Sequence, residues 1–176
     1  MLGNLIGIVG PAAVGKSTVA RFLQAELARD GDLWLILELD AFATSLPRNW
    51  IALNGRAGRF AGRGFIYHRE GPDRIDLTIG PDGRRFLAAF HRSVAAVLHS
   101  GVNVICETIV YDPADWDDWL EALKGAPAWW VKLNAPRGAV SPTATRLRSG
   151  AGSPNPATLQ AMTARHSARA AERLSR

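Results

Sequence analysis

Residues 10–17 read Gly10-Pro11-Ala12-Ala13-Val14-Gly15-Lys16-Ser17 and match the pattern G-x-x-x-x-G-K-[ST] of a phosphate-binding loop. An apolar run at residues 5–9 leads into this loop, and an amphipathic run at residues 18–29 leads away from it. A strand, a glycine loop and a helix in this order direct consecutive backbone N–H groups at a polyphosphate. We therefore expect MgATP as the ligand, with Lys16 reaching the β- and γ-phosphates and the Ser17 hydroxyl binding Mg²⁺. The expected nucleotide-binding residues of the loop are Gly10, Pro11, Ala12, Ala13, Val14, Gly15, Lys16, Ser17 and Thr18.

The composition is that of one ordinary globular domain. The chain has 176 residues, 47% of them hydrophobic and 21% charged, which suits a single substantial core. The only cysteine, Cys106, lies in an apolar run, so we expect a buried thiol in a reducing compartment. We expect neither a signal peptide nor an apolar run of the roughly 20 residues that a membrane helix needs. These features predict a cytoplasmic protein.

The formal net charge of +5 comes almost wholly from arginine, because lysine occurs only at Lys16, Lys124 and Lys132. Arginine suits bidentate contacts with phosphate. An arginine-biased genome produces the same excess without a functional meaning. We rank both explanations above nucleic-acid binding.

Apolar and amphipathic runs alternate along the chain. We expect strands at residues 4–9, 33–39, 102–106 and 129–133. We expect helices at residues 18–29, 82–100, 112–125 and 156–174, the third with Asp112 as its N-cap and Pro113 at its first position. The alternation predicts a three-layer α/β fold of the P-loop nucleotide-kinase type, with a mainly parallel sheet of four to five strands. We expect one domain over residues 1–176, with a lid segment at 137–157.

Residues 41–83 have no clear periodicity. Residues 55–64 form a glycine/arginine cluster, for which we expect a mobile loop. Residues 75–79 are expected to form a short extended piece before Gly80-Pro81. On the neighbouring helices, His91 and His99 are expected at the surface, and Trp116 and Trp119 in the core.

Ligands of parallel sheets bind beyond the carboxyl ends of the strands. This rule places the phosphate loop, Asp40, Glu107 and Asn134 at one edge. Phosphoryl transfer needs positioned phosphates, a metal and an oriented nucleophile. Asp40 is a candidate to accept the proton of an acceptor hydroxyl or to bind Mg²⁺ through water, and Glu107 is the alternative metal-side carboxylate. Each of the two carboxylates is also compatible with a helix N-cap or a loop salt bridge.

Arginines beyond the fourth strand are candidates to close over the phosphates, where a cation would offset the charge that develops during transfer. They are Arg137, Arg146 and Arg148. We expect at least one of them to contact the nucleotide.

The sequence resembles chloramphenicol phosphotransferase and related small P-loop kinases from about residue 4 to about residue 135. The resemblance rests on the loop at 10–17, Asp40 with Pro47 and Trp50 downstream, the segment Ile79-Gly80-Pro81 with Arg84 or Arg85, and residues 93–97 leading into 101–107. The chain departs from the family pattern at Glu107-Thr108, where the family has an aspartate pair. After Pro136 it has no counterpart of the family's closing strand.

The resemblance implies an ATP-dependent kinase that acts on a hydroxyl of a small antibiotic-like molecule. It implies that Asp40 is the general base. Together with the roles assigned above from the residues themselves, the expected catalytic residues are Lys16, Asp40 and Glu107. The acceptor-binding residues that it implies are Phe42, Leu46, Pro47, Trp50, Phe86 and Phe90.

Two alternatives stay open. One is a kinase of a metabolite or a nucleotide-sugar. The other is a non-catalytic nucleotide- or nucleic-acid-binding module that uses the basic stretch at 165–173 and the cluster at 55–64. The sequence makes no prediction about the oligomeric state.

Overall fold

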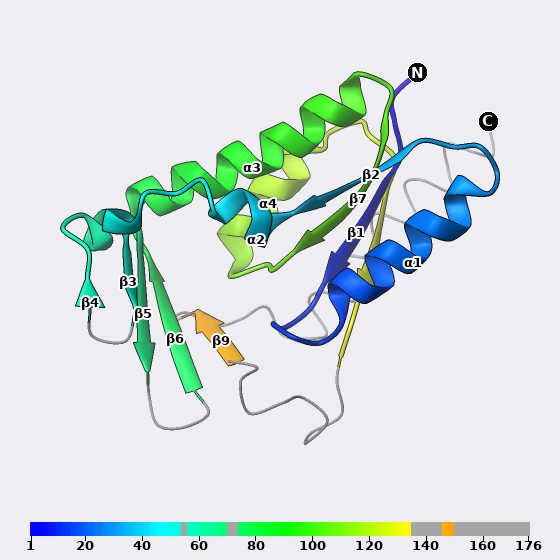
Figure 1. Cartoon of the computed structure of the whole chain (residues 1–176). Helices are drawn as coiled ribbons and strands as arrows, with labels where there is room; N and C mark the ends of the chain where they lie inside the picture. The colour runs from blue at the N-terminus through cyan, green and yellow to red at the C-terminus, as the bar shows by residue number, and fades with distance from the viewer. Residues whose placement is uncertain (54–55, 70–73, 135–145, 150–176) are drawn as a thin grey trace.

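The computed structural model describes residues 1–53, 56–69, 74–134 and 146–149 (Figure 1). Its central sheet consists of parallel strands in the order β2-β7-β1-β8. The strands are β1 (Leu5–Val9), β2 (Trp34–Glu38), β7 (Asn103–Thr108) and β8 (Ala128–Lys132). All four lie where the apolar runs predict them, which confirms the expected parallel sheet and α/β class.

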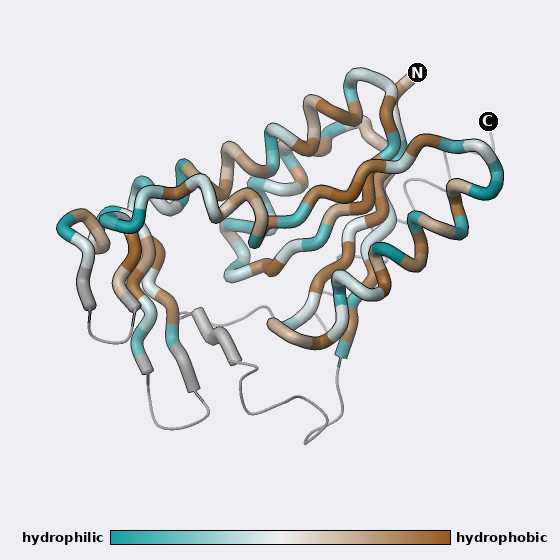
Figure 2. Tube along the Cα trace, in the orientation of Figure 1, coloured by the Kyte–Doolittle hydropathy of each residue, from teal (hydrophilic) through white to brown (hydrophobic). Residues whose placement is uncertain are grey.

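Helices cover the two faces of this sheet. They are α1 (Lys16–Ala28) on one face and α3 (Pro81–His99) with α4 (Pro113–Ala122) on the other (Figure 1). Ile8 of β1 packs with Ala20 of α1, while Leu5 of β1 packs in the cluster of Val94 and Trp119. Because the sheet is covered on both faces, its strands are mainly apolar, as the tube coloured by hydropathy shows (Figure 2). The result is the predicted three-layer arrangement.

The helix ends follow the expected signals. Pro81 is the first residue of α3, and Gly101, with φ 87°, follows its end. The side chain of Asp112 caps α4 by accepting a hydrogen bond from the backbone N–H of Asp115. Pro113 then starts the helix, and Gly125, with φ 86°, follows it.

A second sheet corrects the expectation for residues 41–83. Its strand order is β4-β3-β5-β6-β9, and Figure 1 places it beside the N-terminal end of α3. The strands are β3 (Ile51–Leu53), β4 (Arg56–Ala57), β5 (Phe65–Arg69), β6 (Arg74–Ile79) and β9 (Arg146–Ser149). The short helices beside them are α2 (Leu39–Ala43), η1 (Arg48–Trp50) and η2 (Ala61–Arg63). Of these strands the sequence predicts only the extended piece at 75–79, because β3 and β4, with three and two residues, offer too few positions for a periodicity to emerge.

The glycine/arginine cluster is packed in its second half. The backbone N–H of Phe60 donates to the carbonyl of Asn49 at 2.8 Å, and that of Gly80 donates to the carbonyl of Gly64 at 2.7 Å. A Cβ on Gly64 would lie 2.0 Å from the carbonyl oxygen of Trp50. The expected mobile loop is therefore wrong for residues 58–64, where glycine permits backbone segments to lie against each other. Residues 54 and 55 lie outside the described residues.

The core contains the expected aromatic residues and one unexpected histidine. Trp116 and Trp119 are 1% and 0% exposed, and the Cys106 thiol is also buried, as predicted. His99 is exposed as expected, but His91 is 1% exposed, which corrects its expected surface position. The carboxylates of α4 that face His91 supply polar partners that a sequence pattern does not reveal.

None of the helices in the described residues has the length and hydrophobicity that crossing a membrane requires. The helix expected at 156–174 lies outside the described residues.

Two glycines, Gly62 and Gly64, test the packing of residues 58–64. Gly64→Ala is expected to destabilise the fold by about 1–3 kcal/mol, because the new methyl group meets the Trp50 backbone. Gly62→Ala is the matched control, since a Cβ there has no atom within 4 Å. Urea unfolding of the two variants measures the difference. Equal stabilities would contradict the packing of residues 58–64.

Candidate active site

The loop of residues 10–17 connects β1 to α1, as the sequence predicts. Ala13 and Gly15 have φ angles of 57° and 94°, and α1 starts at Lys16 without a side-chain cap on Gly15. Positive φ angles next to a helix start turn successive backbone N–H groups toward one point, where an anion binds. The loop therefore has the backbone form of a phosphate site.

Lys16 folds back over this loop. Its Nζ donates hydrogen bonds to the carbonyl oxygens of Gly10 at 3.2 Å and Pro11 at 3.1 Å, and the residue is 5% exposed. Burial lowers the pKa of Lys16 below its ordinary value, and the negative charges of Glu107 and Asp40 oppose this decrease. The ammonium group thus lies at the phosphate loop with two carboxylates near it.

Glu107 faces Lys16 from the neighbouring strand. The register of the sheet places Glu107 of β7 beside Ile8 of β1 and Glu38 of β2. Its Oε1 lies 3.9 Å from Nζ of Lys16, whereas its buried Oε2 has no hydrogen-bond partner among the described residues. A buried carboxylate oxygen without a partner has the capacity to bind water or a metal-bound water. Ser17, half-buried, follows Lys16 at the start of α1.

Asp40 lies directly after β2, in the first turn of α2, and is exposed. Its negative charge acts on the pKa values of Lys16, Tyr67 and Tyr111, which come from three different elements. The structure thus brings Asp40, Lys16 and Glu107 together, as the rule for parallel sheets predicts. In Figure 1 the carboxyl ends of β1, β2 and β7 point toward the second sheet.

An aromatic cluster follows Asp40 along the chain and consists of Phe42, Phe65, Phe86 and Phe90. The ring centroid of Phe42 lies 5.1 Å from that of Phe86 and 5.3 Å from that of Phe90. Phe42 and Phe86 are half-buried and Phe90 is buried. Three of the residues expected to contact an acceptor therefore lie together, with Leu46 packed against the same core.

Trp50 and Pro47 lie elsewhere. The Trp50 ring packs on Phe60 at 4.7 Å, and its Nε1 donates a hydrogen bond to Oδ2 of Asp82 at 3.1 Å. This hydrogen bond, together with Arg63 and Arg85, keeps the pKa of Asp82 below its ordinary value. Trp50 thus has structural contacts at the start of α3, while Pro47 is exposed.

Two tyrosines near Asp40 were missed by sequence reasoning. Burial and the charge of Asp40 raise the pKa of Tyr67, on β5. Burial also raises the pKa of Tyr111, to which Tyr67, Asp115 and Asp40 contribute. Both phenols are therefore in the hydroxyl form at neutral pH. The apolar–polar pattern of residues 65–69 was the available signal for Tyr67, whereas Tyr111 follows a strand with no distinguishing pattern.

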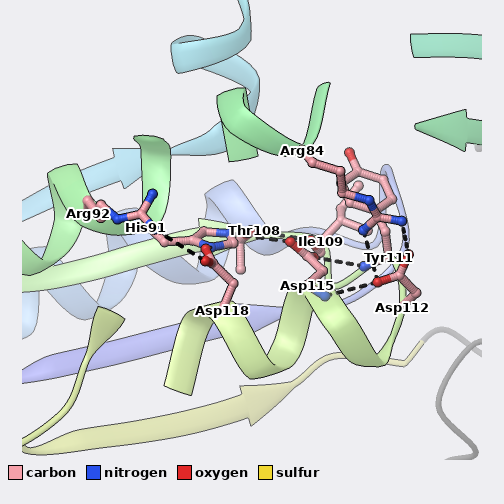
Figure 3. Close-up of polar contacts among 9 residues, drawn as sticks. All are labelled: Arg84, His91, Arg92, Thr108, Ile109, Tyr111, Asp112, Asp115 and Asp118. Carbon is pink, nitrogen blue, oxygen red and sulfur yellow. Dashed lines mark hydrogen bonds and ion pairs between the residues drawn. The ribbon is translucent and has the colours of Figure 1, made fainter. Parts of the chain in front are cut away.

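An ion pair ties α3 to the turn after β7 (Figure 3). Nη1 of Arg84 donates to Oδ1 of Asp112 at 3.0 Å, and Nη2 donates to Oδ2. Burial disfavours the charged form of Asp112, but hydrogen bonds from Arg84 and from the backbone of Asp115 outweigh it, and the pKa of Asp112 lies below its ordinary value. Asp112 therefore links the start of α4 to the start of α3.

Two of the arginines after β8 lie in the second sheet. The backbone of Arg146 and Arg148 belongs to β9, which pairs in parallel with β6, while their side chains and Arg137 lie outside the described residues. Asn134 follows β8 and is exposed.

Solved structures share this fold. The Mycobacterium tuberculosis APS kinase CysC in complex with AMPPNP and APS matches with a TM-score of 0.54 at 14% identity, covering 92% of this chain and 96% of that chain. A mutant of the same kinase matches with a TM-score of 0.50 at 15% identity, covering 92% and 95%. APE1195 matches with a TM-score of 0.52 at 19% identity over 76% of this chain. This chain spans 62% of APE1195 and 61% of a sugar kinase from Janibacter sp. HTCC2649.

These likenesses and the phosphate loop place the chain in the fold class of the P-loop kinases. The family model of chloramphenicol phosphotransferase-like proteins matches residues 3–168, and the chain belongs to this family. The match extends beyond residue 135, where the resemblance was expected to end. None of the curated proteins matches the chain.

Removing the Asp112 carboxylate tests its double role. Asp112→Ala is expected to destabilise the protein by about 1–3 kcal/mol, because α4 loses its N-cap and Arg84 loses its partner. Because the pKa of Asp112 is lowered in the folded protein, its contribution is complete above the ordinary value of 3.8 and is lost as the pH falls below it. Urea unfolding at pH 7 measures the effect.

Asp117→Ala is the control, since Asp117 is exposed on the same helix. A loss of stability in this control equal to that of Asp112→Ala would contradict the role of the cap and ion pair.

Proposed function

We propose that this protein is an ATP-dependent O-phosphotransferase that transfers the γ-phosphoryl group to a hydroxyl of a small molecule, an antibiotic such as chloramphenicol. The observation that carries the proposal is the position of Asp40 beside the Lys16–Glu107 pair, next to the aromatic cluster. A phosphate site beside a carboxylate, with apolar groups behind it, is what transfer to a partly apolar alcohol requires.

The donor side consists of the loop from Gly10 to Thr18. Its backbone N–H groups would hold the phosphates, and Lys16 would leave the carbonyls of Gly10 and Pro11 to bind the β- and γ-phosphates. Its hydrogen bonds to these two carbonyls would hold the ammonium group at the loop before phosphate binds. Positioning and charge neutralisation are the main contributions of a protein to phosphoryl transfer.

The residues present fit a magnesium ion. The Ser17 hydroxyl and Glu107, with its unpartnered Oε2, are oxygen donors of the kind that Mg²⁺ prefers, and Asp40 is the alternative through water. When bound, Mg²⁺ neutralises charge on the phosphate oxygens. Glu107 would hold it through water, because Mg²⁺ usually retains several waters.

Asp40 would act as the general base. The acceptor oxygen forms a bond with the γ-phosphorus while the bond to the β-phosphate oxygen breaks, and the hydroxyl proton passes to Asp40 as ADP leaves. A positioned base of this kind contributes about 10²–10⁴-fold to the rate. Exposure of Asp40 leaves its carboxylate accessible to an acceptor.

The acceptor would contact Phe42, Phe86 and Phe90, with Tyr67 as a further neighbour of Asp40. Neutral phenol and phenyl groups around one carboxylate favour an uncharged, partly apolar alcohol over an anionic one. The family description supports chloramphenicol as the first compound to test. Pro47 and Trp50 would contact the acceptor only peripherally, because the Trp50 ring packs on Phe60.

We also propose that residues 1–176 act as one domain, since one core cluster joins Phe65 and Leu77 of the second sheet to Leu5 and Val104 of the central sheet. The segment at 137–157 would be the lid, with Arg146 and Arg148 over the phosphates.

A panel of hydroxylated compounds tests the proposal. ATP consumption is measured with chloramphenicol, other antibiotics, nucleosides and nucleotide-sugars, and the phosphorylated product is identified by mass. Phosphorylation of chloramphenicol or a related antibiotic is expected. Transfer only to a nucleotide-sugar would overturn the antibiotic acceptor, and no transfer to any member would overturn the O-phosphotransferase.

Asp40→Asn is expected to lower kcat by about 10²–10⁴-fold while ATP affinity stays within about threefold, because the amide cannot take the proton. Steady-state kinetics with the accepted acceptor and calorimetry with ATP separate the two effects. Asp32→Asn is the control, since Asp32 is exposed before β2, at the opposite edge of the sheet. An unchanged kcat in Asp40→Asn would remove the base from the mechanism.

Lys16→Ala is expected to weaken MgATP binding by at least about tenfold and to lower kcat as well, because the phosphates lose their buried cation. Calorimetry and kinetics measure both quantities. Normal MgATP affinity in this variant would contradict the assignment of the loop.

A further inference from the structure

The buried ring of His91 lies between two carboxylates of α4 (Figure 3). Its Nδ1 is 2.6 Å from Oδ2 of Asp118, and its Nε2 is 3.4 Å from Oδ1 of Asp115. The ring also stacks on Trp119, with 4.1 Å between the centroids. The side chains of His91 and Asp115 are each 1% exposed, so water cannot readily replace the contact between them.

The short contact with Asp118 fixes the proton on one ring nitrogen. A carboxylate oxygen accepts hydrogen bonds, so Nδ1 of His91 must be the donor. In a neutral imidazole, Nε2 is then a bare acceptor. It faces Oδ1 of Asp115, which has no hydrogen bond to any other described residue. Two bare acceptors facing each other in a buried site repel and leave both unsatisfied. One proton between Nε2 and Oδ1 removes the repulsion and gives both atoms a hydrogen-bond partner.

The surroundings determine where this proton resides. The pKa of Asp115 is raised to about 7, mainly by burial; the charges of Asp112 and Asp118 act in the same direction, and the Tyr111 N–H and Arg84 oppose the increase. Burial and Arg92 lower the pKa of His91, against the hydrogen bond and charge of Asp118. These groups come from α3, α4 and the turn between β7 and α4. Together they favour a neutral His91 beside a protonated Asp115.

We propose that Asp115 carries a proton on Oδ1, donates it to Nε2 of His91, and so holds the turn after β7 in place through its Oδ2. This turn, residues 109–112, starts two residues after Glu107. Oδ2 of Asp115 accepts the backbone N–H of Tyr111 at 3.0 Å, and the backbone N–H of Asp115 donates to Oδ1 of Asp112 at 2.9 Å. Asp115 is thus a positioning residue that acts through Tyr111.

The turn of residues 109–112 connects the pair of His91 and Asp115 to the candidate active site. Tyr111 is buried, and the charges of Tyr67 and Asp40 affect its pKa. Arg84 holds the other end of the turn through Asp112. Loss of the Asp115 proton would leave Oδ1 and Nε2 of His91 facing each other as bare acceptors, and their repulsion would move the Asp115 side chain away from Tyr111. An effect of this turn on acceptor binding would rest on the proposed function, whereas the proton shared by Asp115 and His91 does not.

Asp115→Asn tests the shared proton, because an amide imitates a protonated carboxyl group. Its oxygen accepts the Tyr111 N–H and its NH₂ donates to Nε2 of His91. The wild-type contribution of Asp115 is lost as the pH rises from the ordinary pKa of 3.8 through about 7. The folding equilibrium constant of Asp115→Asn relative to wild type is therefore expected to increase about 10²-fold between pH 5 and pH 8. Urea unfolding of the full chain measures it.

Asp115→Ala and Asp117→Asn are the matched variants. Asp115→Ala is expected to be less stable than Asp115→Asn at both pH values, because it leaves Nε2 and the Tyr111 N–H unpartnered. Asp117→Asn, on the exposed side of the same helix, is expected to keep a constant ratio to wild type. A constant ratio for Asp115→Asn as well would overturn the proposal.

NMR of the wild-type protein gives a second measurement that needs no variant. The ring nitrogens of His91 are expected to report the neutral Nδ1–H form at pH 6, and the Tyr111 amide is expected to exchange slowly at pH 6 and faster at pH 8.5. An imidazolium at pH 6, or exchange of Tyr111 that follows only the intrinsic pH dependence, would overturn the proposal. Neither measurement uses ATP or an acceptor, so a failure of the proposed function leaves this result independent.

Discussion

The buried pair of Lys16 and Glu107 is the contact on which the candidate site depends. Lys16 starts α1 and Glu107 belongs to β7, and only the parallel register that sets Glu107 beside Ile8 places their charges 3.9 Å apart. A buried ammonium group without a nearby carboxylate would be costly, and the carboxylate would be costly alone. Their proximity keeps both in a site from which water is largely excluded. It thereby sets a cation and a carboxylate oxygen at the same edge of the sheet, where we propose that they meet phosphate and a metal-bound water.

The second sheet contributes aromatic side chains near Asp40. Its strand β5 carries Phe65 and Tyr67, while α2 carries Asp40 and Phe42, so that the carboxylate has aromatic neighbours from two elements. The turn after β7 adds Tyr111, which is held by Asp115 and, through Asp112, by Arg84. The phosphate loop thus depends on the parallel sheet, and the side proposed for an acceptor depends on α2, β5 and this turn. The two sides meet at Asp40.

The sequence was sufficient for the central sheet because each of its strands is covered on both faces and each helix has a recognisable start. Asp40, Glu107 and the loop at 10–17 could be placed at one edge from strand order alone. The second sheet could not be predicted, because β3 and β4 are two or three residues long and pair with partners up to about 14 residues away. His91 was misplaced for a similar reason, since its polar partners Asp115 and Asp118 come from another helix. Tyr67 and Tyr111 became candidates only through their three-dimensional position near Asp40.

We propose that the loop, Asp40 and Glu107 surround one bound metal–nucleotide complex. Replacing Mg²⁺ by paramagnetic Mn²⁺ tests it in a nitrogen–proton NMR spectrum of the full chain with ATP. The account predicts that amide signals of residues 12–18, 40–42 and 107–109 broaden together, while those of Asp32 and Gly125, at the opposite edge of the sheet, keep their widths. Broadening confined to the loop, or spread evenly over the chain, would contradict the account.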